Sequence, residues 1–130
     1  MVRDAALMLL LLLVSGCAGD TTADTRVRTA LDVLAQVIDP AYSVAMDSCI
    51  VPQEIAVAEA EAGLATVDHA RQTIERVRAR CGRVREGFET IRLHHEQAVR
   101  SVEAGQLDQA AQILEQIRLD WTLLRTGGVM

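Results

Sequence analysis

The sequence predicts an all-α protein: an antiparallel helical hairpin plus a third helix, packed as a small coiled-coil-like bundle. Half of the residues are hydrophobic but only 2% are aromatic, so the core must be built from Leu, Ile, Val and many Ala. Such a composition favours closely packed helices. Three segments repeat apolar residues at alternating three- and four-residue steps, which is the spacing of one helical face. The short connections between them predict antiparallel packing.

The first helical segment begins near Val27. Its predicted apolar face consists of Val27, Leu31, Leu34, Ile38, Ala41, Ala45 and Ser48. A proline removes a backbone donor and crowds the preceding turn, so Asp39-Pro40 predicts a kink or a restarted helix. Pro52 predicts a second break in this segment.

The second segment has the strongest periodicity and is the expected structural spine. Its predicted seam consists of Val67, Ala70, Ile74, Val77, Cys81, Val84, Phe88, Ile91, His95, Ala98 and Val102. This pattern predicts a long helix with a coiled-coil-like seam and with Phe88 buried near its middle. Gly105 ends it, since glycine readily adopts the positive φ that follows a helix.

The third segment carries a shorter stripe and stops at Gly127-Gly128. Its members are Leu107, Ala110, Leu114, Ile117, Trp121 and Leu124. Between the first and second segments two interpretations stay open. Either the chain turns near Gly63 and forms a hairpin, or Pro52 to Val102 is one continuous helix, because Ala56, Ala60 and Gly63 extend the same seam.

The N-terminus has the pattern of an export signal. Arg3 precedes the ten-residue apolar stretch Ala5–Val14, which is too short to span a bilayer. The residues Val14-Ser15-Gly16-Cys17 resemble the lipobox of bacterial lipoproteins. The resemblance implies that the Cys17 thiol takes a diacylglycerol, that the chain is cut before it, and that the new amino terminus is acylated, which gives a stable anchor. The alternative is an ordinary secretory peptide cut after Ala18.

The expected organisation follows from this resemblance. Residues 1–16 are the signal peptide, 17–25 the lipidated cysteine and a flexible tether, 26–126 one helical domain, and 127–130 a short tail. The expected location is the periplasmic side of the bacterial envelope. The outer membrane is slightly favoured, because Ala18 and not aspartate follows the cysteine. The formal net charge of −5 argues against general nucleic-acid binding.

The lipoprotein resemblance leaves Cys49 and Cys81 as an even pair in a compartment where disulfides persist. Their midpoint is residue 65, so a turn near Gly63 would bring them opposite each other and a bond would clamp the hairpin. The alternative is two buried free thiols. If Pro52 to Val102 were one helix, the two cysteines would lie too far apart to bond.

His94 and His95 are weak candidates for a metal site. Adjacent residues on a helix diverge by about 100°, and neither histidine has a strong ligand three or four residues away. We therefore expect no metal: His95 should be a polar seam member bonded to a neighbour, and His94 should be exposed. A metal would need ligands from elsewhere, such as His69 or a partner chain.

Five arginines occur within residues 76–85 of an otherwise acidic protein. Arg78, Arg80 and Arg85 flank the predicted seam, at positions where charges select partner helices. They are candidates to face a protein, lipid headgroups or anionic envelope polymers. The alternative is a solvated helix surface.

The sequence contains no set of residues at the spacing expected of a catalytic site. No serine lies in a nucleophile-elbow pattern and there is no glycine-rich phosphate loop, so we expect neither an enzyme nor a cofactor. The expected function is a lipid-anchored envelope protein that binds a protein partner or a surface, with a homo-oligomer through the helix seams as one form of partner. The alternatives are a periplasmic metal or ligand sensor, and a phage- or prophage-encoded envelope lipoprotein in lysis or exclusion.

Overall fold

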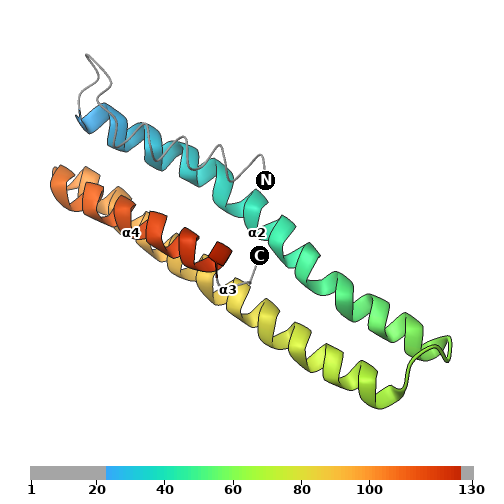
Figure 1. The fold of residues 1–130 in the computed structure, drawn as a ribbon. Helices are drawn as coiled ribbons and strands as arrows, with labels where there is room; N and C mark the ends of the chain where they lie inside the picture. The colour runs from blue at the N-terminus through green and yellow to red at the C-terminus, as the bar shows by residue number, and fades with distance from the viewer. Residues whose placement is uncertain (1–22, 127–130) are drawn as a thin grey trace.

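A computed structural model describes residues 23–126, which form three helices joined by two tight turns (Figure 1). Helix α2 spans Ala23–Glu61, α3 spans Val67–Glu103 and α4 spans Leu107–Thr126. Helices α2 and α3 form an antiparallel hairpin, and α4 folds back along the second half of α3. The predicted all-α hairpin with a third helix is confirmed. The predicted signal peptide, Cys17 and the predicted tail 127–130 lie outside the described residues.

The turn between α2 and α3 decides between the two interpretations of residues 52–102. Gly63 has a φ of 73°, a conformation that is costly for residues with a Cβ. Thr66 then caps α3, because its side-chain oxygen accepts a hydrogen bond of 3.1 Å from the backbone N–H of His69. The chain therefore reverses here, and the continuous-helix interpretation is wrong.

A restarted helix at Pro40 and a break at Pro52 are wrong, because α2 continues as one helix through both prolines. An interior proline costs about 3 kcal/mol through its lost hydrogen bond and its crowding of the preceding turn. Burial on both sides offsets this cost: Ile38 and Ala41 flank the first proline, and Cys49 and Ala56 flank the second. Tertiary packing thus overrides the local preference.

Helix α2 also begins at Ala23, so it includes the last three residues of the predicted tether. Asp24 lies in its first turn, where a carboxylate interacts favourably with the helix dipole. Asp24 accepts a hydrogen bond of 2.8 Å from Arg28, one turn further on. These two local interactions extend the helix into a segment that carries no apolar periodicity.

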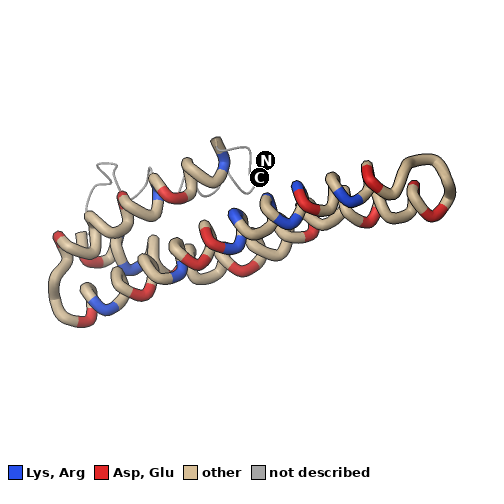
Figure 2. The backbone as a smooth tube through the Cα atoms, turned by 90° about the horizontal axis from the view of Figure 1, so that it is seen from below, with Lys and Arg blue, Asp and Glu red and all other residues tan. Residues whose placement is uncertain are grey.

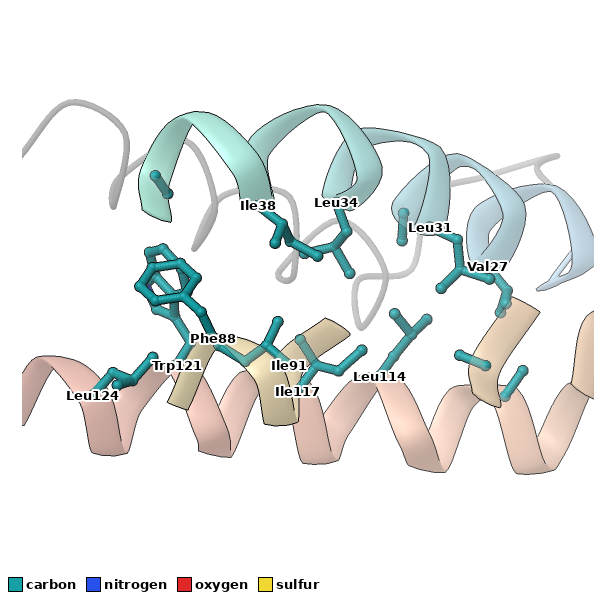
Figure 3. Packing of buried hydrophobic residues seen from close by; sticks show 14 of the residues in the cluster. Val27, Leu31, Leu34, Ile38, Phe88, Ile91, Leu114, Ile117, Trp121 and Leu124 are labelled. Atoms are coloured by element: carbon teal, nitrogen blue, oxygen red, sulfur yellow. The ribbon is translucent and has the colours of Figure 1, made fainter. Parts of the chain in front are cut away.

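The main hydrophobic core lies where all three helices run side by side (Figure 3). Phe88 is fully buried at its centre, as predicted. Its ring meets Tyr42 of α2 at 5.3 Å and Trp121 of α4 at 5.7 Å between centroids, both in edge-on geometry. The only three aromatic residues of the chain thus converge at one junction.

Two members of the predicted seams lie elsewhere. Val67 is 68% exposed, because it is the first residue of α3 and nothing from α2 covers it there. Ser48 is exposed and Cys49 takes its place in the core. The step from Ala45 to Cys49 is four residues where the regular alternation required three, so the contact face of α2 shifts by one position.

A second, smaller core contains residues of α2 and α3 only. It consists of Cys49, Val77 and Cys81, with Met46 packed against it. The border with the main core lies at Gly87, where an added Cβ would come within 2.2 Å of a side-chain carbon of Leu124 near the end of α4. Beyond this point α2 and α3 project as a two-helix extension, which we call the arm and define as residues 44–86 (Figure 1).

Candidate interaction site

The arm exposes an apolar stripe on α2. Val44, Val51 and Ile55 are 50%, 46% and 51% exposed. They are spaced by seven and four residues, so they lie on one face of the helix. No third helix covers this face in the part of the chain that the structure describes. Exposed apolar residues that share one face of a helix can mark an interaction surface.

The neighbouring face of α3 is covered by α4 in the three-helix part and is uncovered beyond the end of α4. Within the three-helix part, this face contains Gly87 and His94, which contact Leu124 and Asp120 of α4. At the same helical spacing, it continues into the arm as Arg83, Arg80 and Arg76. The face that α4 buries at one end is therefore basic and uncovered at the other.

A shallow groove of about 390 Å³ lies between the two helices of the arm. It is lined by Cys49, Pro52, His69, Thr73, Arg76, Val77 and Arg80. Of the three arginines predicted to face a partner, only Arg80 lines this groove and is half-buried, while Arg78 and Arg85 are exposed. Arg80 therefore lies at the groove. Arg76 and Arg83 lie on the same face of α3 as Arg80, although the apolar periodicity did not identify them as candidates to face a partner.

The two helices of the arm carry opposite charge (Figure 2). Between residues 44 and 61, α2 has four carboxylates and no basic residue. Between residues 67 and 86, α3 has six arginines and three carboxylates, a formal excess of three positive charges. The arm is therefore acidic along one helix and basic along the other.

Four exposed charged residues of the arm form no ion pair within residues 23–126. In the three-helix part, Arg92 donates a hydrogen bond of 2.9 Å to Asp39 and its guanidinium lies 4.8 Å from the centre of the Tyr42 ring. Within residues 23–126, by contrast, neither Asp47 nor Glu54 forms an ion pair, and neither do Arg76 and Arg83, all four being exposed. The arm thus presents carboxylates and guanidinium groups that remain accessible to a partner.

The two cysteines lie across from each other in the arm. Their Cα atoms are 5.7 Å apart and their sulfur atoms are within bonding distance, 32 residues apart in the sequence. Both side chains are buried in the smaller core. This juxtaposition agrees with the predicted clamp and gives the arm a cross-link where no third helix supports it.

The histidines take part in structural contacts. His95 donates from Nε2 to the Leu31 carbonyl at 2.8 Å, which confirms a seam histidine bonded to a neighbour. His94 was expected to be exposed, and this is wrong: its side chain is 23% exposed and Nδ1 donates to the carboxylate of Asp120 at 2.5 Å. Sequence spacing missed this contact because Asp120 lies on another helix.

No group of three or more metal-ligating side chains occurs within residues 23–126. His69 cannot join His94 within one chain, since 25 residues of the same helix separate them, roughly 37 Å. No helix in this range has the length and apolar content needed to cross a membrane.

The ion pair between Glu115 and Arg118 on α4 shifts the pKa of both groups. The hydrogen bond from Arg118 lowers the pKa of the Glu115 carboxyl, and the same bond raises the pKa of Arg118. The Glu115 side chain is exposed and the Arg118 side chain is partly exposed, so solvent screens this pair and it contributes little to stability. It lies on the three-helix part and plays no role at the arm.

Comparison of the chain with protein-family models, with curated proteins and with solved structures gave no match.

Proposed function

We propose that this chain is a lipid-anchored helical protein of the bacterial cell envelope that acts by binding a protein through its arm. The observation that carries the proposal is the uncovered stripe of Val44, Val51 and Ile55, bordered by unpaired charges of both signs. The lipobox-like residues that end at Cys17 support the anchor.

The arrangement of the helices supports display away from a membrane. Helix α2 begins at Ala23, at the end of the molecule where α3 meets α4 (Figure 1). An anchor on Cys17 would hold that end. Helix α2 has 39 residues and is therefore roughly 58 Å long, so the turn around Gly63 lies at the far end from the anchor.

The chemistry of the arm favours a protein over an anionic surface. An apolar centre with polar and charged groups at its rim is typical of protein interfaces. The acidic residues of α2, among them Asp47 and Glu54, would be repelled by anionic headgroups. A basic helix alone would suit a lipid or polymer surface, but this arm presents both signs together.

The anchor is tested by replacing Cys17 with Ser and fractionating the cells. We expect the wild type in the membrane fraction with acyl chains detected by mass spectrometry, and the variant without them. The matched control replaces both Cys49 and Cys81 with Ser, which should leave fractionation and acylation unchanged. An acylated, membrane-bound Cys17→Ser variant would overturn the anchor.

The binding role is tested by placing a photo-crosslinking amino acid at Val51 or Ile55 of the full-length chain in living cells. We expect a defined protein adduct from each position. The control position is Leu93, which is 54% exposed but lies on the three-helix part. The absence of any protein adduct from the arm, with the chain correctly folded, would overturn the proposed function.

A further inference from the structure

We infer, on the basis of the proposed function, that the protein bound by the arm presents an amphipathic helix, here called the partner helix. It lies in line with α4, on the uncovered face of α3 and against the apolar stripe of α2. One flank of the partner helix carries carboxylates toward α3, and the other flank carries basic side chains toward α2.

Helix α4 shows what this face of α3 accepts. In the three-helix part, α4 packs so closely that an added Cβ at Gly87 would come within 2.2 Å of a side-chain carbon of Leu124. Seven residues further along the same face, His94 donates a hydrogen bond to the Asp120 carboxylate of α4. The face therefore takes a helix along its length, and a carboxylate of that helix pairs with an α3 side chain.

The same face continues beyond the end of α4, where no helix covers it within residues 23–126 (Figure 1). Its residues recur at steps of three and four, and we call them the α3 row: Arg83, Arg80, Arg76, Thr73 and His69. At 1.5 Å per residue the α3 row is roughly 21 Å long, which seats a helix of about 14 residues.

The register of the hairpin places the apolar stripe of α2 beside the α3 row. Residues at the same height on α2 and α3 have numbers that add up to about 130, as shown by Cys49 with Cys81 and by Tyr42 with Phe88. The stripe is therefore level with residues 75–86 of α3. A helix seated on the α3 row meets the stripe over the same turns.

The groove of the arm lies between the α3 row and the stripe. Pro52 lines it on α2, and Arg76 and Arg80 line it on α3. Ile55 follows Pro52 by three residues, which are adjacent positions on a helix surface. A helix in this groove therefore contacts the α3 row with one flank and the stripe with the other, and its apolar face lies between these flanks.

The arginines require carboxylates on the flank that meets α3. Arg76 and Arg83 are exposed, seven residues apart, and without an ion pair within residues 23–126. A guanidinium that a helix covers loses solvation, and a hydrogen-bonded carboxylate offsets this cost. Two carboxylates about seven residues apart on the partner helix match the spacing of the two arginines.

The acidic residues of α2 determine the charge of the other flank. Asp47 follows Val44 by three residues and Glu54 follows Val51 by three, so both lie beside the stripe. Both are exposed and form no ion pair in the described part of the chain. Basic side chains on this flank would pair with them, whereas carboxylates would be repelled. The arm thus selects a helix that is acidic along one flank and basic along the other.

The test places a photo-reactive amino acid at Ile55 or at His69 of the full-length chain in living cells. These positions lie on the two sides of the groove, so we expect both to cross-link to the same segment of the same protein. Mass spectrometry should identify this segment as an amphipathic helix with acidic residues on one flank and basic residues on the other. Cross-links to two different proteins, or to a segment without this pattern, would overturn the inference.

Charge reversal tests the pairing with α3. Arg76→Glu with Arg83→Glu should lower the yield of the adduct from Ile55 by about tenfold. The matched control is Arg78→Glu with Arg85→Glu, which reverses two exposed arginines at the same spacing on the opposite side of α3. The control should change the yield by less than about twofold.

Arginine in place of two acidic residues of the identified segment should also lower the yield by about tenfold. Combining these changes with Arg76→Glu and Arg83→Glu should return the yield to about the wild-type value. Because the exchanged arginines are exposed, helix content by circular dichroism should remain unchanged in every variant of the arm. A yield unaffected by Arg76→Glu with Arg83→Glu, or lowered equally by the control pair, would overturn the inference.

Adducts with a second copy of this chain would overturn the partner helix while leaving the proposed function in place. Adducts that contain lipid or polymer and no protein would overturn both, and so would the absence of any adduct from a correctly folded chain.

Discussion

Replacing Phe88 with Ala should remove most of the stability of the three-helix part. Phe88 is fully buried on α3 and makes edge-on contacts with Tyr42 of α2 and Trp121 of α4. Truncation of a buried Phe costs about 3–5 kcal/mol, and each aromatic pair contributes about 0.5–1.5 kcal/mol beyond buried area. Because both pairs are lost together, we expect a loss of about 4 kcal/mol in the free energy of unfolding.

This loss is measured by urea denaturation of a chain that begins at Ala18, followed by the fluorescence of Trp121 and by helical circular dichroism. With a slope of about 1.5 kcal/mol per molar urea, the midpoint should fall by about 2.7 M. Trp121 is the only tryptophan and touches Phe88, so its fluorescence reports on this junction directly.

Two control variants separate packing from helix propensity. Phe88→Leu keeps most of the buried volume and should cost less than about half of the alanine loss. Leu93→Ala removes an exposed side chain from the same helix and should change stability by at most about 0.5 kcal/mol. A loss below about 1 kcal/mol for Phe88→Ala would refute the conclusion that this residue holds the three helices together.

Further predictions concern the clamp and the attachment of α4. Peptide mapping without reductant should recover Cys49 and Cys81 as one linked pair, and replacing both with Ser should cost about 3–4 kcal/mol by urea denaturation, from the closed loop between them. Two free thiols in protein purified without reductant would contradict this. Gly87→Ala should destabilise the chain by about 1–3 kcal/mol, because the added Cβ would clash with Leu124 of α4. Gly82→Ala faces open space and should stabilise the chain slightly. Equal effects of the two substitutions would contradict the close approach of α4 to Gly87. Asp120→Asn removes the negative charge from the group that accepts the hydrogen bond of His94 Nδ1, and it should cost about 1 kcal/mol in the same assay. No loss of stability would argue against that hydrogen bond.

The periodic features of this fold could be predicted from the sequence. The stripe from Ala70 to Val102 and the burial of Phe88 follow from local rules of spacing. The turn at Gly63 was one of two open interpretations, because the same apolar seam also fitted one continuous helix, and the structure selects the turn. The same local rules failed at Pro40 and Pro52, because packing on α3 decides whether a helix survives a proline.

The interaction surface was only partly predictable. The arginine-rich stretch was visible, but its seam-flanking members Arg78 and Arg85 are not the ones that share the α4 face. That face can be identified only from the contact between Gly87 and Leu124, because the end of α4 determines where α3 is uncovered. The same limit applies to His94 and its contact on α4.

The attachment of α4 has a consequence for how the molecule opens. Helix α4 packs chiefly on α3 and has little contact with α2, and no cross-link holds it, whereas the cysteine pair ties α2 to α3. Proteins open in cooperative units whose free energies follow such differences in attachment. Helix α4 is therefore the unit that detaches first, and its departure would expose on α3 a continuous face from Arg76 to His94, more than twice the length of the Arg76–Arg83 face that is open now.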